Sequence, residues 1–153
     1  MIIYRLAIEA FKDDLTGTGS KLFGGRWNVP GYPAIYTAEN ISLAVLEILV
    51  NTDKNNIPPT YQLLQLQVPD NLPIKVIKAD TLKEKWYHDF EYAQFIGSRF
   101  LESGKESILK VPSAIVRQEY NYLLNPLHAD FKKVSIKECS AFDLDIRLLK
   151  THE

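Results

Sequence analysis

The pattern of apolar and polar positions predicts short strands interspersed with two helices. Runs that are rich in β-branched and aromatic residues, or that alternate between apolar and polar positions, are typical of strands. Such runs lie at 2–9, 34–38, 60–68, 73–78, 107–117, 120–124 and 131–138, and 143–149 is read as a further strand or turn. Since the predicted strands outnumber the helices, we expect an α+β fold.

Two segments have the apolar spacing of helices. The first runs to about Asn51, with Asn40 or Ser42 as its N-cap. The second spans about 88–103, and Gly104 is placed to end it. Its apolar face is predicted to consist of Phe90, Ala93, Ile96, Phe100 and Leu101.

The segment 13–33 is predicted to be a long loop. It holds Gly17, Gly19, Gly24, Gly25 and Gly31, together with two prolines, so many of its positions are free to adopt unusual backbone angles. Loops of this length in a compact domain are usually functional or disordered. The aromatic side chains within the segment argue against disorder, which leaves a functional loop as the expectation.

Length and composition indicate one globular domain spanning 1–153. A net charge of −1 gives no support to binding of nucleic acid or of a membrane surface. Cys139 is the single cysteine, so no disulfide forms within the chain. The N-terminal segment lacks the pattern of a signal peptide, and no apolar run approaches the roughly 20 residues that span a bilayer. We therefore expect a cytoplasmic protein.

Glu47 is the first candidate for chemistry. The segment from Ile41 to Val50 contains eight aliphatic residues, one serine and this glutamate. A carboxylate on so apolar a helix is costly to bury unless it is compensated. Glu47 either occupies a narrow strip of the helix that meets water, or it is a catalytic carboxylate that faces a pocket.

The second candidate is the run Gly24-Gly25-Arg26-Trp27-Asn28. Paired glycines allow a ligand to approach the backbone, and an arginine fork suits phosphate. Trp27 offers a flat apolar face, so the run would suit a phosphate-bearing ligand with rings. The plainer alternative is a tight turn followed by a packed tryptophan and a surface arginine.

Further along the chain, Tyr36 precedes the Glu47 helix and is either a stacking platform or a core tyrosine. Ser113 lies in an apolar strand, where it bonds a ligand or merely its own backbone. The Asn125-Pro126 pair is a turn signal.

Several common site types are excluded by the sequence. It has no dinucleotide-binding GxGxxG run, no P-loop and no GxSxG elbow. Its histidines, His88, His128 and His152, do not form a metal-ligand cluster with one another or with Cys139, so no metal site is expected.

Taken together, these motifs resemble the RES domain. The resemblance rests on GGRWN at 24–28, AIYTAENISLAVLEIL at 34–49, VPSAIV at 111–116 and NYLLNPLHADF at 121–131, in that order. It extends from about residue 4 to 149. It places the family arginine, tyrosine, glutamate and serine on Arg26, Tyr36, Glu47 and Ser113, with Arg5 as a further candidate and with Asn121 and Asn125 matching late asparagines of the family.

The resemblance implies a fold similar to that of ADP-ribosyltransferase toxins, with mixed or antiparallel sheets and a few helices. It implies that NAD is the substrate and not a cofactor. It also implies a toxin of a type II toxin–antitoxin pair, whose partner is an Xre-type helix-turn-helix antitoxin that blocks the active site, and it allows a homodimer within that complex.

The residues and the resemblance together suggest one mechanism. Breaking the nicotinamide–ribosyl bond builds positive charge on the ribose, which Glu47 is expected to stabilise. Arg26, helped by Arg5, is expected to hold the pyrophosphate, and Tyr36 to stack on nicotinamide or its ribose. Ser113 is expected either to bond that ribose or to position Glu47. Trp27 and Asn125 complete the expected substrate-binding set.

The sequence leaves several functions open. Hydrolysis of NAD, its phosphorolysis, and transfer of ADP-ribose to a protein require the same cleft and differ in the acceptor. A non-catalytic nucleotide-binding module and a purely structural α+β domain are the alternatives from other classes. Nucleic-acid cleavage is disfavoured by the slightly negative net charge.

Overall fold

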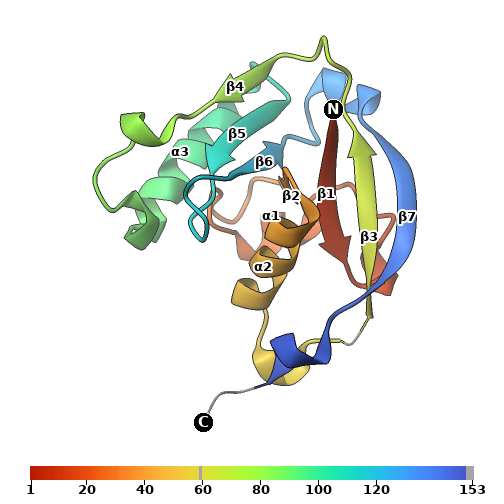
Figure 1. The fold of residues 1–153 in the computed structure, drawn as a ribbon. Helices are drawn as coiled ribbons and strands as arrows, with labels where there is room; N and C mark the ends of the chain where they lie inside the picture. The colour runs from red at the N-terminus through yellow and green to blue at the C-terminus, as the bar shows by residue number, and fades with distance from the viewer. Residues whose placement is uncertain (59, 151–153) are drawn as a thin grey trace.

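A computed structural model describes residues 1–58 and 60–150 of the chain (Figure 1). The strands are β1 (Ile2–Ala7), β2 (Ile35–Ala38), β3 (Thr60–Gln67), β4 (Ile74–Val76), β5 (Ile108–Pro112), β6 (Tyr120–Leu124) and β7 (Ser135–Asp143). The α-helices are α1 (Thr18–Phe23), α2 (Ile41–Asn51) and α3 (Phe90–Ser103). Short 3-10 helices occupy Glu9–Phe11, Lys54–Asn56, Ala79–Thr81, Trp86–His88, Ala129–Lys133 and Ile146–Leu149.

The strands form one sheet in the order β4-β5-β6-β2-β1-β3-β7. The β4–β5 pair is parallel and the other pairs are antiparallel. The sheet is therefore mixed, and the expected α+β fold is confirmed. Between β1 and β2 a single pair of residues, Tyr4 and Ala38, is in register. This seam is consequently the most sparsely paired junction of the sheet.

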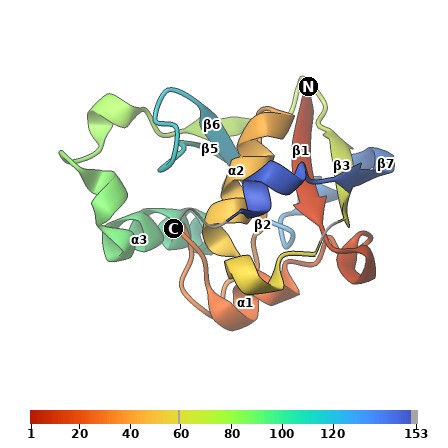
Figure 2. The same ribbon diagram turned by 60° about the horizontal axis from the view of Figure 1, so that its bottom comes forward.

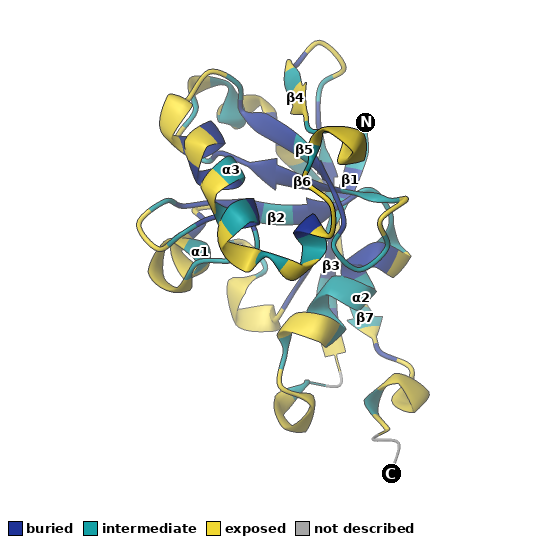
Figure 3. Ribbon diagram, turned by 90° about the vertical axis from the view of Figure 1, so that its left-hand side faces the viewer, coloured by how far each residue is buried: buried dark blue, intermediate teal, exposed yellow. Residues whose placement is uncertain are grey.

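Apolar side chains cover both faces of the sheet. One face packs Ile3, Ile35, Leu64 and Leu124 into a cluster that Phe131 helps to close. On the other face α2 covers the β1–β3 side, where Leu43 and Leu63 belong to the same cluster, and α3 covers β5 and β6. The two helices thus lie apart along the same face of the sheet (Figure 2). Figure 3 shows the central strands buried between these layers.

The ends of both long helices follow local sequence signals. The side chain of Asn40 accepts a hydrogen bond of 2.7 Å from the backbone of Leu43, so Asn40 is the cap that begins α2. Asp89 caps α3 in the same way through the amide of Tyr92, at 2.9 Å. Gly104 ends α3 with φ +58°, a conformation that favours glycine. The predicted cap at Asn40 and the predicted stop at Gly104 are confirmed, whereas α3 begins at Phe90 and not at about residue 88.

Three predicted segments differ from the structure. The loop at 13–33 contains α1, a helix that ends at Gly24. The predicted strand 107–117 ends at Pro112, because Ser113 begins a turn by accepting hydrogen bonds from the amides of Ile115 and Val116.

The predicted strand 131–138 is also displaced along the chain. Residues Ala129–Lys133 form a 3-10 helix, and the strand β7 begins only at Ser135 and continues to Asp143. Its position is set by pairing with β3, including a register shift beside Gln65. After β7, the segment 143–149 continues into a 3-10 helix.

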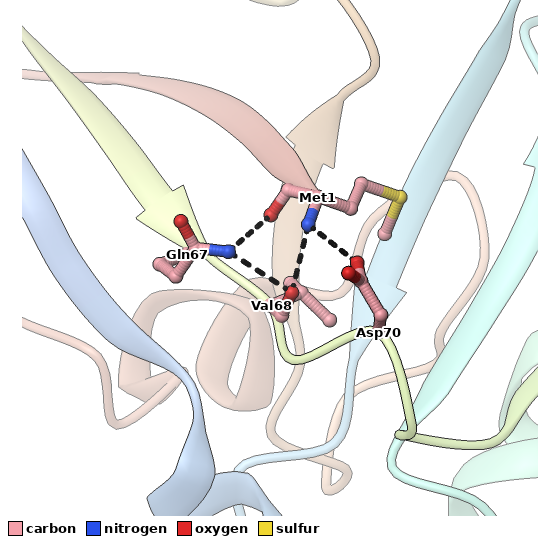
Figure 4. Close-up of polar contacts among 4 residues, drawn as sticks. All are labelled: Met1, Gln67, Val68 and Asp70. Carbon is pink, nitrogen blue, oxygen red and sulfur yellow. Dashed lines mark hydrogen bonds and ion pairs between the residues drawn. The ribbon is translucent and has the colours of Figure 1, made fainter.

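The start of β1 is tied to the end of β3 by polar contacts (Figure 4). The terminal amine of Met1 donates to the carbonyl of Val68 at 2.9 Å and to Oδ1 of Asp70 at 3.1 Å. The side chain of Gln67 donates to the carbonyls of Met1 and Val68. These contacts hold β1, and with it Arg5, in register with β3. Among the helices described, none has the length and apolar character needed to cross a membrane.

Candidate active site

A cavity of about 540 Å³ opens at the seam between β1 and β2. Residues from both strands of the seam line the cavity. They are Tyr4, Arg5 and Leu6 from β1 and Tyr36, Thr37 and Ala38 from β2. α2 contributes Glu47, the glycine-rich segment contributes Gly25 and Arg26, and β6 contributes Asn121. The volume is in the range typical of small-molecule sites, which is roughly 300–1,000 Å³.

Glu47 is half-buried in the wall of this cavity. It is the seventh residue of α2, whose other side packs in the core. The side-chain amide of Asn121 donates to Oε1 of Glu47 at 2.6 Å. The hydroxyl of Ser113 donates to the same oxygen at 3.2 Å. A carboxylate on an apolar helix is thereby compensated by two donors from distant parts of the sequence.

Ser113 is completely buried and lies just after β5. Its oxygen accepts hydrogen bonds from the backbone amides of Ile115, at 3.1 Å, and Val116, at 3.2 Å. A hydroxyl accepts two hydrogen bonds and donates one, so its proton is directed to Glu47. Of the expectations for Ser113, this geometry favours contact with its own backbone and with Glu47.

Tyr36 lines the cavity, and its hydroxyl is fixed at both sides. It accepts a hydrogen bond from the backbone of Trp27 at 3.0 Å and donates one to Oδ1 of Asn28 at 2.5 Å. Burial raises the pKa of the Tyr36 hydroxyl well above its ordinary value. The phenol is therefore neutral in the working pH range and suited to binding and shaping the site.

The turn that carries Arg26 is held together by Asn28. Gly25 and Asn28 pair across it through backbone hydrogen bonds. The amide of Asn28 donates to the carbonyls of Ser20, Val29 and Tyr32, which ties both ends of the glycine-rich segment to the turn. The segment is therefore an ordered wall of the cavity.

Two arginines contribute positive charge to the cavity wall. The guanidinium of Arg26 donates to the carbonyl of Tyr87 at 3.3 Å and lies 5.1 Å from the ring centre of Phe90. Arg5 is largely enclosed, and burial lowers the pKa of its guanidinium, while the charge of Asp14 acts in the opposite direction. An arginine stays protonated at neutral pH even so. The arrangement suits a ligand with anionic groups.

Asp14 adds a carboxylate to the same wall. Its Oδ1 accepts hydrogen bonds from the backbone and the hydroxyl of Thr16, and these contacts hold the pKa of Asp14 below its ordinary value. The charge of Arg5 acts in the same direction. The cavity is therefore lined by charges of both signs.

The structure brings Arg5, Arg26, Tyr36 and Glu47 to one cavity, with Ser113 in contact with Glu47. Trp27 contributes to the wall, but the residue is 1% exposed and its ring packs against Trp86 at 5.5 Å between ring centres. Core side chains thus cover most of the ring. Asn125 is buried outside the cavity wall, where it contacts the backbone of Leu101 and Leu127.

Three residues of this site have no role that the sequence predicts. Asn28 is the last residue of the run that begins at Gly24, but the sequence gives no sign that a polar residue in a turn will be buried. Asp14 stands two residues before Thr16, a spacing typical of an Asx turn. Asn121 was matched to the family without a role, because its contact with Glu47 joins residues 74 positions apart.

The described residues contain no group of three histidine, cysteine or acidic side chains placed to hold a metal ion. His128 caps the 3-10 helix at Ala129–Lys133 by accepting a hydrogen bond from Asp130. His152 lies outside the described residues.

Comparison with known proteins gives consistent results. A model of the RES domain matches residues 2–147. A protein named Toxin Res from Photorhabdus laumondii is 39% identical over 98% of both chains. The Prs ADP-ribosylating toxin from Sphingobium sp. (strain YBL2) is 34% identical over 96% of both chains.

Two further matches concern MbcT proteins. The NAD(+) phosphorylase MbcT of Mycobacterium tuberculosis is 34% identical over a shared segment that covers 40% of this chain and 37% of that protein. The crystal structure of the M. tuberculosis MbcT–MbcA toxin–antitoxin complex matches with a TM-score of 0.74, at 22% identity, over 97% of this chain and 86% of the other. It supports the fold assigned above. The family match covers nearly the whole chain, and the protein therefore belongs to the RES domain family.

Proposed function

We propose that this protein is the toxin of a toxin–antitoxin pair and that it acts by cleaving the nicotinamide–ribosyl bond of NAD. The observation that carries the proposal is the fixed carboxylate of Glu47 in a cavity that is also lined by Arg5 and Arg26. In NAD, the ribose that develops positive charge needs an anionic side chain, and the pyrophosphate needs a cationic one. Both side chains must lie within reach of the same bound molecule. This cavity supplies both.

The proposed reaction begins with cleavage of the bond between C1′ of the ribose and the nicotinamide nitrogen. The bonding electron pair leaves with nicotinamide, whose ring becomes neutral, so no general acid is needed. The ribose acquires oxocarbenium character, which the carboxylate of Glu47 stabilises. Because Glu47 is already hydrogen-bonded to Ser113 and Asn121, it does not have to reorganise as the charge forms.

The other residues of the cavity act on binding in this scheme. Arg26 holds the pyrophosphate, and its own position is fixed by the carbonyl of Tyr87 and the ring of Phe90. Arg5 adds a second positive charge from β1. Tyr36, kept neutral by burial, presents its ring to nicotinamide or the adjoining ribose.

The acceptor of ADP-ribose decides between three reactions. Attack by water gives ADP-ribose and releases a proton, and attack by inorganic phosphate gives ADP-ribose 1″-phosphate. The name of the M. tuberculosis relative, NAD(+) phosphorylase, favours phosphate. The name of the Sphingobium relative, an ADP-ribosylating toxin, favours a protein acceptor as the second candidate.

Three incubations of the purified protein separate these reactions. With NAD alone, loss of NAD and release of free ADP-ribose indicate hydrolysis. Added phosphate that accelerates the loss and yields ADP-ribose 1″-phosphate indicates phosphorolysis. Slow loss, with labelled ADP-ribose appearing on a protein of a cell extract, indicates transfer.

Glu47→Gln provides the matched control, since it keeps the size of the side chain and removes its charge. We expect it to lower turnover by about 100-fold or more, the size typical of losing an electrostatic contact to the transition state. Turnover by Glu47→Gln close to that of the unmodified protein would refute the role of Glu47.

The structural comparison supports a protein partner for this chain. The structural neighbour was solved as a toxin–antitoxin complex. We infer an antitoxin for this chain, of the Xre helix-turn-helix type that the family resemblance implies, and a homodimer of the toxin within that complex. Expression of the chain alone is expected to arrest growth with a fall in cellular NAD, and expression with the antitoxin is expected to prevent both. Light scattering of the purified complex measures its stoichiometry.

A further inference from the structure

Two hydrogen bonds to Glu47 converge on one of its two carboxylate oxygens. Asn121 donates its amide to Oε1 at 2.6 Å, and Ser113 donates its hydroxyl to the same atom at 3.2 Å. Within residues 1–58 and 60–150, Oε2 has no comparable partner. The carboxylate is therefore held by one oxygen and presents the other to the cavity.

This contact also fixes which way the amide of Asn121 faces. A carboxylate accepts hydrogen bonds and does not donate them, so the nitrogen of the amide must face Glu47 and the oxygen must face away. Asn121 is 9% exposed, and its Oδ1 is buried without a hydrogen-bond donor among the described residues. Buried acceptors are rarely left unpaired unless a ligand or water serves them.

The place of Asn121 indicates what that partner is. The residue belongs to β6 and lines the same cavity as Glu47. Oδ1 itself has almost no accessible surface in this structure, so a donor reaches it only when the bound substrate displaces the groups that cover it. The nitrogen and oxygen of one amide share a single carbon, so such a donor lies close to Glu47. In NAD positioned with its reacting ribose at Glu47, the nearest donors are the hydroxyl groups of that ribose.

We propose that Asn121 couples the carboxylate to the substrate, with its amide nitrogen positioning Glu47 and its amide oxygen accepting a hydrogen bond from a hydroxyl of the nicotinamide ribose. This inference rests on the proposed cleavage of NAD. It makes Asn121 a specificity residue for an intact ribose and separates its role from that of Ser113, whose hydroxyl is fully engaged within the protein.

The contact with the substrate is tested by removing the ribose hydroxyl, the side chain of Asn121, and then both. NAD and its analogues lacking the 2′- or the 3′-hydroxyl of the nicotinamide ribose are turned over by the unmodified protein and by Asn121→Ala. For each protein, the fall in kcat/KM from NAD to the analogue is measured. For one of the two analogues, we expect this fall to be about tenfold larger in the unmodified protein than in Asn121→Ala. Equal losses in the two proteins, for both analogues, would overturn the contact with ribose.

The positioning of Glu47 is tested without any substrate. The side-chain amide protons of Asn121 are observed by NMR and identified by their disappearance in Asn121→Ala. We expect these protons to exchange with solvent slowly in the unmodified protein and at least about tenfold faster in Glu47→Ala, which lacks the acceptor. An unchanged rate would overturn the positioning role.

Asn121→Asp adds a kinetic test that distinguishes a positioning role of Asn121 from a merely structural one. It keeps an acceptor oxygen and the shape of the side chain, but it replaces the donor with a second carboxylate against Glu47. We expect kcat to fall by about 100-fold while KM changes by less than about threefold. Asn71→Asp, an exposed position between β3 and β4, adds the same charge away from the cavity and is expected to retain full turnover.

The two proposals fail in different ways. If the unmodified protein does not cleave NAD with any acceptor, the proposed function is wrong, and the exchange of the Asn121 amide still decides whether this residue positions Glu47. If the unmodified protein cleaves NAD and Asn121→Ala retains its kcat within about threefold, the function stands and the inference about Asn121 is wrong.

Discussion

A Cβ atom at Gly25 would lie 2.6 Å from the hydroxyl oxygen of Tyr36. The ring carbon that carries this hydroxyl would be 2.8 Å away. Both distances are shorter than side chains tolerate, so the close approach of the loop to β2 requires glycine at this position. The paired glycines before Arg26 thus serve the protein's own packing, and through it the cavity wall.

Gly25→Ala is therefore expected to displace Tyr36 and to lower NAD cleavage by tenfold or more, on the order of the penalty for misplacing a binding group. The measurement is kcat/KM together with a circular dichroism spectrum that shows a folded protein. Gly19→Ala is the control for stability, since a Cβ there meets nothing within 4 Å and alanine favours the helix α1, so its melting temperature should not fall below that of the unmodified protein. Unchanged turnover by Gly25→Ala would show that Tyr36 has room to move.

Ser113→Ala should affect stability and catalysis together. It leaves the partly buried amides of Ile115 and Val116 without their acceptor and removes a donor to Glu47. We expect the free energy of unfolding to fall by about 1–3 kcal/mol. We also expect kcat to fall while KM stays nearly constant, because the serine does not contact the substrate in this scheme.

Urea unfolding and steady-state kinetics measure the two effects of Ser113→Ala. Ser135→Ala, at an exposed position at the start of β7, is the matched control and should change neither. A stability loss with an unchanged kcat would mean that Ser113 supports only its own turn.

The Tyr36 hydroxyl predicts a particular dependence of stability on pH. Its pKa is raised in the folded protein, while in the unfolded chain the hydroxyl titrates near its ordinary value of about 10. Its contribution is therefore fully present below about pH 10. It declines as the pH rises further, because the unfolded chain releases a proton that the folded protein keeps.

Tyr36→Phe removes this titration, so above about pH 10 its stability should fall less steeply with pH than that of the unmodified protein. At neutral pH the variant should be less stable, since the amide of Trp27 loses its acceptor and Asn28 loses its donor. Urea unfolding at several pH values between about 8 and 11 provides the comparison. Parallel slopes would contradict a buried, neutral phenol.

Asn40→Ala tests whether the capping of α2 acts on folding or on chemistry. The variant removes the acceptor for the amide of Leu43, and we expect a loss of about 0.5–2 kcal/mol in the free energy of unfolding. Asn40→Ser should restore most of it, because serine is also a good cap. Turnover should stay within about twofold in both, since α2 remains held against β1 and β2 by its apolar side chains. A large fall in the kcat of Asn40→Ala would mean that the cap also orients Glu47.

The sequence alone determined the features that depend on neighbours along the chain. Asn40 and Gly104 set helix ends through contacts within one turn, and the apolar run around Glu47 marked an unusual carboxylate. The order of four short motifs also determined the family. Boundaries that depend on distant partners were predicted less well, as the displacement of β7 shows, since its register is set by β3.

The tertiary structure decided what these residues face. Trp27 and Asn125 have the same residue types that a ligand site uses, but the fold buries the first against Trp86 and places the second outside the cavity. Ser113 and Asn121 meet Glu47 across 66 and 74 residues. No local pattern encodes such meetings, because they arise from the order and register of strands in the sheet.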